Sequence, residues 1–186
     1  MDYYEQNLQK KKEIENGLLE LMQRVPFQQI TVTDLARHMG MSRKSFYHYF
    51  SNREACLESL MDRMIQEAAL HVATTSRGFS IAPADFVINL EYWRMQQPFL
   101  NAVAQNQLHD VFLERHIRFV KDNRVLYSLL TLPDAEFDED VLHFYASGHL
   151  SILMRWLHRD FTPPAEEMAC KYLRLLCTPL IQPEEK

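Results

Sequence analysis

Glycine is scarce in this chain, with four in 186 residues. β-Hairpin turns and phosphate-binding loops draw on glycine because it reaches backbone conformations that other residues avoid. The scarcity therefore argues against both and favours helices joined by short turns. Apolar residues make up 47% of the chain and aromatic residues 11%, which is enough to build a hydrophobic core and excludes a disordered chain. The sequence predicts an all-α protein.

Apolar spacing and turn-forming residues divide the chain into successive helices. Over residues 8–25 the apolar residues recur near the 3.6-residue period of a helix, and Pro26 ends that segment. The apolar residues of that stripe are Leu8, Ile14, Leu18, Leu21, Met22 and Val25. The helices predicted after it cover residues 31 or 33 to 39, 42–49, 52–76, 84–96, 98–105, 107–131, 138–159 and 164–178.

Two of these predicted helices are short and adjacent, as in a helix-turn-helix. Thr31 or Thr33 can cap the first and Ser42 the second, and Gly40 suits the left-handed turn between them. The inner face consists of Leu35, Ala36, Met41 and Phe46. An α-helix fits the major groove of B-DNA, and the first helix can hold the second at a fixed angle. The outer face would present Arg43, Lys44, Ser45, Tyr47 and His48.

The charge of the chain is unevenly divided. Residues 1–50 hold seven Lys and Arg against six Asp and Glu, a net charge of +1, while the whole chain carries −5, which leaves −6 for residues 51–186. This asymmetry points weakly to the N-terminal part as the end that binds nucleic acid.

The run from Thr33 to Glu54, TDLARHMGMSRKSFYHYFSNRE, resembles the DNA-binding signature of the TetR family of bacterial regulators (TetR/AcrR type). The resemblance covers about residues 8–60. Lys44, Ser45 and Arg53 differ from the residues common at their positions, although Arg53 keeps the positive charge. The resemblance implies a helix-turn-helix domain of three helices over residues 1–52, a connecting helix over about 53–76, and a helical effector-binding and dimerisation domain over 77–186.

The resemblance also implies a role at the DNA for individual residues. Arg43, Lys44 and Ser45 would face base edges, and Tyr47 would contact phosphate and base. Backbone phosphates would be bound by Thr33, Tyr49 and Arg53. The expected DNA-binding set is Thr33, Ser42, Arg43, Lys44, Ser45, Tyr47, His48, Tyr49 and Arg53. The alternative for His48 and Tyr49 is packing beneath the next helix, and Phe46 and Phe50 are expected in the core.

One helix-turn-helix (the reading head) makes few contacts with DNA, so we expect a homodimer that binds two half-sites of double-stranded DNA. The interface candidates are the last two long helices, as the resemblance also implies, and Gly148 would allow close helix approach. The expected interface is Tyr145, Gly148, Ile152, Arg155, Trp156, Met168, Tyr172 and Leu175. The alternative is that these residues cover the core of their own protomer.

Aromatic residues and histidines are dense in the helices between the reading head and the interface. The resemblance implies that these helices enclose a small-molecule pocket and that the ligand favours the state that does not bind DNA. The expected pocket residues are Trp93, Phe112, His116, Phe119 and Phe144. Each of them can instead be ordinary core. The resemblance favours a ligand-responsive repressor.

Other functions find little support in the sequence. It contains no Gly-rich loop, Gly-x-Ser-x-Gly or His-Glu-x-x-His motif, so we expect no catalytic residues and no enzyme. The histidine pairs lack the i, i+4 spacing of helical zinc sites, and no metal or other cofactor is expected. No apolar run approaches the ~20 residues of a membrane span, so we expect a cytoplasmic protein. The main alternative is a helical protein-interaction module that has lost operator binding.

Overall fold

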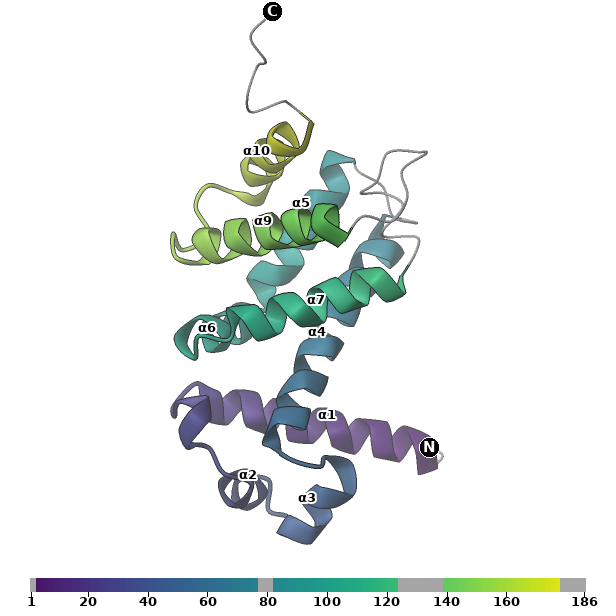
Figure 1. Cartoon of the computed structure of the whole chain (residues 1–186), viewed down its shortest axis with the longest axis vertical. Helices are drawn as coiled ribbons and strands as arrows, with labels where there is room; N and C mark the ends of the chain where they lie inside the picture. The colour runs from purple at the N-terminus through teal and green to yellow at the C-terminus, as the bar shows by residue number, and fades with distance from the viewer. Residues whose placement is uncertain (1–2, 77–81, 124–138, 178–186) are drawn as a thin grey trace, which may run out of the picture.

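The computed structural model describes residues 3–76, 82–123 and 139–177, and all regular elements in these ranges are helices (Figure 1). The elements are α1 (Tyr3–Met22), the 3-10 helix η1 (Phe27–Gln29), α2 (Val32–His38), α3 (Arg43–Tyr49), α4 (Arg53–Thr75), α5 (Pro83–Met95), α6 (Gln97–Gln105), α7 (His109–Asp122), α9 (Glu139–Leu157) and α10 (Ala165–Cys177). The described part of the chain confirms the all-α prediction.

The helices form two groups joined by α4. Helices α1, α2 and α3 lie together at one end of the molecule, while α5, α7, α9 and α10 lie toward the other end (Figure 1). Helix α4 contacts α1 near its start and then α5 and α7. Helix α6 contacts both α1 and α9, so it is a second bridge between the groups. One hydrophobic cluster extends from Ile14 in α1 to Ala169 in α10, and the two groups therefore pack as neighbours.

Local signals set most helix ends where the sequence predicts them. Ser42 caps α3 and Asn52 caps α4, and Gly40 takes the left-handed conformation with φ of 61°. Thr31, rather than Thr33, caps α2 through a capping box with Asp34. In that box the hydrogen bonds from the Thr31 side chain and backbone lower the pKa of Asp34.

Two predicted helices differ from the structure at their ends. Helix α1 runs from Tyr3 to Met22 rather than over residues 8–25, and Leu8 is 43% exposed, because none of the described helices covers the first turns of α1. Helix α7 ends at Asp122, whereas the predicted helix ran to residue 131, and residues 124–131 lie outside the described ranges.

Candidate DNA interface

Helix α3 is held on the protein by its aromatic inner face. Phe46 is fully buried, and its ring lies 5.9 Å from the ring of Phe50, which is also buried. The Ser42 side chain accepts a hydrogen bond from the backbone N–H of Ser45 at 3.0 Å, which fixes the first turn. Gly17 of α1 leaves room for the Met39 side chain at the end of α2, because a Cβ there would lie 2.1 Å from its sulfur. These contacts fix the orientation of α3 on the three-helix group.

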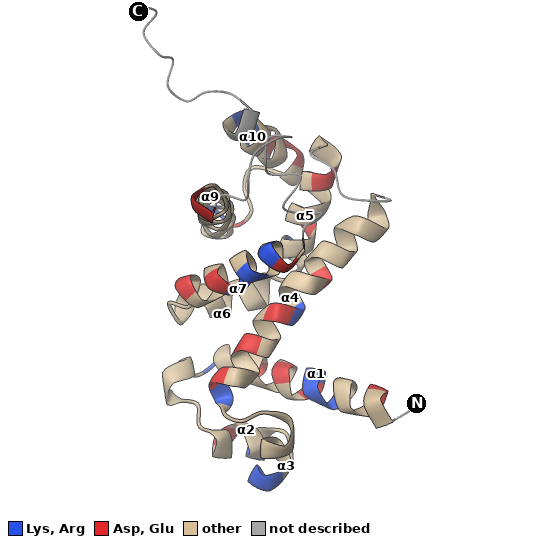
Figure 2. Ribbon diagram, turned by 45° about the vertical axis from the view of Figure 1, so that its right-hand side comes forward, with Lys and Arg blue, Asp and Glu red and all other residues tan. Residues whose placement is uncertain are grey.

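The outer face of α3 is exposed and cationic. Arg43, Lys44 and His48 are exposed, and Tyr47 is 48% exposed. Within the described ranges Arg43 and Lys44 form no ion pair, whereas Arg37 on α2 lies 3.5 Å from Asp34. Figure 2 shows the basic residues of α3 at the end of the molecule farthest from α10. The structure therefore brings together the predicted base-contacting side chains on one free surface.

The remaining predicted DNA residues surround this surface in different ways. Thr33 is exposed near the start of α2, where a phosphate can approach it. Ser42 and Ser45 place their hydroxyl oxygens 2.9 Å apart, so one donates to the other. Tyr49 is half-buried and packs against the core, and its ring lies 5.1 Å from that of exposed His48. The packing alternative thus fits Tyr49 better than His48.

Arg53 has an internal role that differs from the expected phosphate contact. Its Nη1 donates to three backbone carbonyls, at 2.8 Å to Phe27, 3.0 Å to Gln28 and 2.5 Å to Ile30. The guanidinium also lies 4.8 Å from the ring centroid of Phe27, and its Nε donates to Glu54 at 2.7 Å. The side chain is 24% exposed. Arg53 thus ties the start of α4 to the turn that precedes α2, and its contact with a backbone phosphate stays a prediction.

Arg53→Ala should lower the free energy of unfolding by about 2 kcal/mol, because it removes a charged donor to three backbone carbonyls, two of them in part-buried contacts. Urea denaturation followed by circular dichroism measures this. Lys44→Ala is the matched control, since Lys44 is an exposed cation without an ion pair in the described ranges and should leave stability unchanged. An Arg53→Ala protein as stable as wild type would contradict this structural role.

Helix α6 is hydrogen-bonded to the same turn. Asn106, 5% exposed, accepts a hydrogen bond from the backbone N–H of Phe27 at 2.5 Å and donates to the carbonyl of Ala102 at 2.8 Å. Gln28 donates to the backbone carbonyl of Asn106 at 3.4 Å. The turn before α2 is therefore bonded on one side to Arg53 and on the other to the end of α6. No sequence motif marks Asn106, because its partners lie 78 and 79 residues away in the chain.

A buried ion pair joins α1 to α4. Glu15 is 3% exposed and accepts from the Nε of Arg63 at 2.5 Å and from the Ser59 hydroxyl at 2.6 Å. Arg63 also donates to the side-chain oxygen of Asn16 at 2.8 Å. The pair fixes the position of α4 relative to the three-helix group, and it too was absent from the predicted site.

The predicted interface residues fall into two groups, those at least partly exposed on the protomer and those buried in its core. Tyr145, Gly148, Ile152, Arg155 and Leu175 are exposed or half-buried. Met168 is half-buried against the core.

Trp156 and Tyr172 are corrected to core residues of their own protomer. Trp156 is 1% exposed and donates from Nε1 to the carbonyl of Pro163 at 2.6 Å. Tyr172 is 8% exposed and lies against Phe86, with ring centroids 5.0 Å apart. The apolar period along each helix indicates which residues share a face, but the inward part of that face is covered within the protomer.

Three of the predicted pocket residues lie together, since the ring centroids of Trp93 and Phe112 are 5.7 Å apart and those of Phe112 and His116 are 6.5 Å apart. Trp93 and Phe112 are each 1% exposed and pack on Phe99 in an aromatic cluster, so they are core. Phe119 is half-buried at a smaller cluster around Ile117 and Val120. Phe144 is 71% exposed, which corrects its assignment to an internal pocket.

Within the described ranges, His116 lies beside other polar side chains inside the protein. Its ring lies 5.7 Å from that of His149, and His149 Nδ1 lies 3.2 Å from the Tyr172 hydroxyl. Burial lowers the pKa of His116 to about 4 and that of His149, with help from His116, to about 3. Both rings are therefore neutral at pH 7, and they place polar atoms between α7, α9 and α10.

None of the described helices combines the length and hydropathy needed to cross a bilayer. No group of three or more His, Cys, Asp or Glu side chains in the described ranges is arranged to hold a metal ion.

Comparison with known proteins locates the resemblance in the N-terminal helices. The sequence profile described as "Bacterial regulatory proteins, tetR family" matches residues 16–60. The HTH-type transcriptional regulator EthR of Mycobacterium tuberculosis is 38% identical over 65 residues. That stretch is 35% of this chain and spans 28% of the length of EthR. The matched residues include α2, α3 and the turn between them.

Solved structures extend the similarity in fold to nearly the whole chain. The fatty acid degradation regulator FadR from Bacillus halodurans has a TM-score of 0.66 at 15% identity, covering 94% of this chain and 97% of that one. Thermus thermophilus FadR, a TetR family transcriptional repressor solved with lauroyl-CoA, has a TM-score of 0.53 at 19% identity over the same shares. At such identities the likeness concerns the fold.

The sequence matches and the solved structures both agree with the arrangement of helices in this chain. The profile and EthR match the segment that forms the capped helices and the free basic face of α3, and the FadR structures share the helical arrangement behind it. The family consists of regulatory proteins and not of enzymes, as the sequence predicts. Residues 16–60 of this chain thus match the tetR family of bacterial regulatory proteins.

Proposed function

We propose that this regulator is a repressor that binds a palindromic operator as a homodimer in the cytoplasm and releases it when a small molecule binds. The observation that carries the DNA-binding part is the outer face of α3. Arg43, Lys44 and Tyr47 are exposed there without ion pairs in the described ranges, on a helix anchored by buried Phe46. Arginine and lysine can donate to guanine N7 and O6, and a tyrosine hydroxyl can reach a phosphate.

The domain division expected from the sequence is part of this proposal. Residues 1–52 would read DNA, the helix over about 53–76 would connect, and residues 77–186 would bind effector and partner. Thr33, Ser42, Ser45 and His48 would support the contacts of Arg43, Lys44 and Tyr47. Tyr49 would help hold α3 rather than contact DNA.

The dimer proposal rests on the exposed side of α9. Gly148 is exposed in the middle of this helix, and no described atom lies within 4 Å of the position a Cβ would take. A glycine inside a helix costs about 0.5–1 kcal/mol relative to alanine, and no contact in the described part of the protomer requires one at this position. Phe144 is 71% exposed one turn earlier on the same helix. A small residue beside an exposed aromatic ring suits close approach of a second α9.

Gly148→Leu should weaken the dimer at least about tenfold, because overpacking a close helix contact costs about 1–3 kcal/mol. Sedimentation equilibrium measures the monomer–dimer constant, and circular dichroism checks that the helix content is unchanged. Glu114→Leu, which adds the same side chain at an exposed position of α7, is the control and should leave the constant unchanged. If both variants dimerise like wild type, the α9 interface is wrong.

Ligand response is supported by the connections between the two groups of helices. Helix α4 and the Asn106 bond tie the turn before α2 to the helices of residues 77–186. A ligand that prefers one arrangement of these helices would shift the orientation of α3, and coupling of ~1–3 kcal/mol is typical of such systems. Thermus thermophilus FadR, similar in fold, was solved with lauroyl-CoA.

Hydroxyl-radical footprinting on a fragment selected from genomic DNA tests this function. We expect two protected half-sites related by symmetry, with centres about one helical turn or a multiple apart, and two chains per site. The alternative, an interaction module without operator binding, predicts no protected site on any fragment. A single unsymmetrical protected stretch would contradict the dimer.

A further inference from the structure

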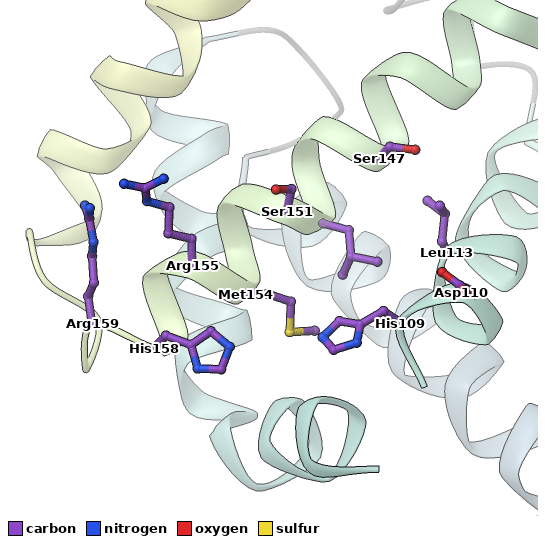
Figure 3. Close-up of a pocket in the computed structure, with 10 residues that line it drawn as sticks. His109, Asp110, Leu113, Ser147, Ser151, Met154, Arg155, His158 and Arg159 are labelled. Atoms are coloured by element: carbon purple, nitrogen blue, oxygen red, sulfur yellow. The ribbon is translucent and has the colours of Figure 1, made fainter. Parts of the chain in front are cut away.

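A groove outside the predicted pocket lies between the start of α7 and the C-terminal half of α9, with a volume of about 560 Å³. Its floor is apolar: Leu150 is 6% and Met154 is 5% exposed, and Leu113 of α7 is half-buried beside them. Figure 3 shows Met154 between two histidines, with Arg155 and Arg159 together at one end of the groove. None of the five predicted pocket residues lines it.

The groove carries a positive net charge, whereas residues 51–186 as a whole carry a negative one. Residues 51–186 carry a net charge of −6, yet the groove holds two arginines against one acid, Asp110. By contrast, the side chain of Arg115 on α7 is paired, because it donates to Asp62 at 2.7 Å and to Glu58 at 3.0 Å. The side chains of Arg155 and Arg159 form no ion pair or hydrogen bond within the described ranges. Their guanidinium groups are therefore available to an anion.

We propose that this groove binds a small amphipathic anion, in which a carboxylate or phosphate meets Arg155 and Arg159 and a short apolar chain lies over Leu113, Leu150 and Met154. A guanidinium binds either anion through paired N–H donors. The volume lies within the ~300–1,000 Å³ range of small-molecule sites, which combine an apolar lining with a few charged groups.

The position of the groove also connects it to the DNA-binding helices. His109, the first residue of α7, lines the groove and follows Asn106 by three residues. Asn106 is the residue that bonds to the backbone N–H of Phe27 before α2. An anion that moves the start of α7 would therefore change the support of α2 and α3. This regulatory part rests on the proposed operator binding, whereas the binding of the anion does not.

Isothermal titration calorimetry of the full chain with octanoate, octyl phosphate and octanamide tests the site. We expect one molecule of octanoate or octyl phosphate per protomer, with the tighter of the two naming the anion, and at least tenfold weaker binding of octanamide. The double variant Arg155→Gln/Arg159→Gln should bind both anions at least tenfold more weakly. Arg118→Gln, an exposed arginine on α7 away from the groove, should bind as wild type does.

Several results would overturn the proposal. These are no binding of either anion, equal binding of octanamide, or unchanged anion binding by the double variant. If the double variant instead loses its dimer in sedimentation and keeps its affinity for the anions, a second copy of the chain occupies this end of the groove. Operator affinity measured with and without octanoate then tests the regulatory part alone, and an unchanged affinity would overturn only that part.

Discussion

Replacing Arg43, Lys44 and Tyr47 together with alanine should lower operator affinity at least about 100-fold and leave the fold unchanged. Each good contact to a base edge contributes about 1–3 kcal/mol, and about 1.4 kcal/mol corresponds to a factor of ten. Stability should not change, because these three side chains are exposed and the anchor of the helix is Phe46. Fluorescence anisotropy with a labelled operator at fixed salt measures the affinity.

The single variants should separate two kinds of contact. A residue that reads a base should relax specificity at one operator position, whereas a residue that binds phosphate should weaken all sequences and reduce the salt dependence. The control is Arg118→Ala/Arg174→Ala, which removes two exposed cations from α7 and α10. If that control weakens operator binding as much as the triple variant, binding reflects net charge and not the face of α3.

Arg63→Met should lower the free energy of unfolding by about 3–5 kcal/mol, the second large effect we expect. The change leaves the Glu15 carboxylate, 3% exposed, without the charge that compensates its burial. Urea denaturation followed by circular dichroism measures the loss. The double variant Glu15→Leu/Arg63→Met should regain most of it, because the buried charge is then removed as well.

Arg94→Met is the control for this prediction. Arg94 pairs with Glu91 at 2.5 Å, but its side chain is 53% exposed, and exposed pairs contribute little. The free energy of unfolding of Arg94→Met should stay within about 1 kcal/mol of that of wild type. If Arg63→Met costs no more than Arg94→Met, the pair between α1 and α4 does not hold the three-helix group in place.

The parts of the fold that sequence predicts well are those set by local chemistry. Pro26 follows α1, Gly40 turns the chain after α2, and Ser42 and Asn52 cap α3 and α4 at the expected positions. Each of these residues acts on a backbone within a few positions of itself. The buried and exposed sides of α3 follow for the same reason, since Phe46 and Tyr47 belong to one short helix.

The parts that sequence does not predict depend on distant partners. Arg53 donates to three backbone carbonyls that lie 23 to 26 residues away in the chain. A sequence motif contains no information about these acceptors, so it predicts only a phosphate contact for Arg53. Trp156 and Phe144 both lie on apolar α9, yet one is 1% and the other 71% exposed. The difference arises because other helices cover one face of α9 and not the other. The spacing of apolar residues within α9 does not show which face is covered. The groove at Arg155 and Arg159 likewise needs α7 and α9 side by side.

The central claim is that the face of α3 reads operator DNA, and selection of genomic fragments by the purified protein tests it most directly. Wild type and the Arg43→Ala/Lys44→Ala/Tyr47→Ala variant are carried through the same rounds. We predict that wild type alone enriches one palindromic site. If no site is enriched, or if the variant selects the same fragments, the face of α3 is not the reading surface and the account is contradicted.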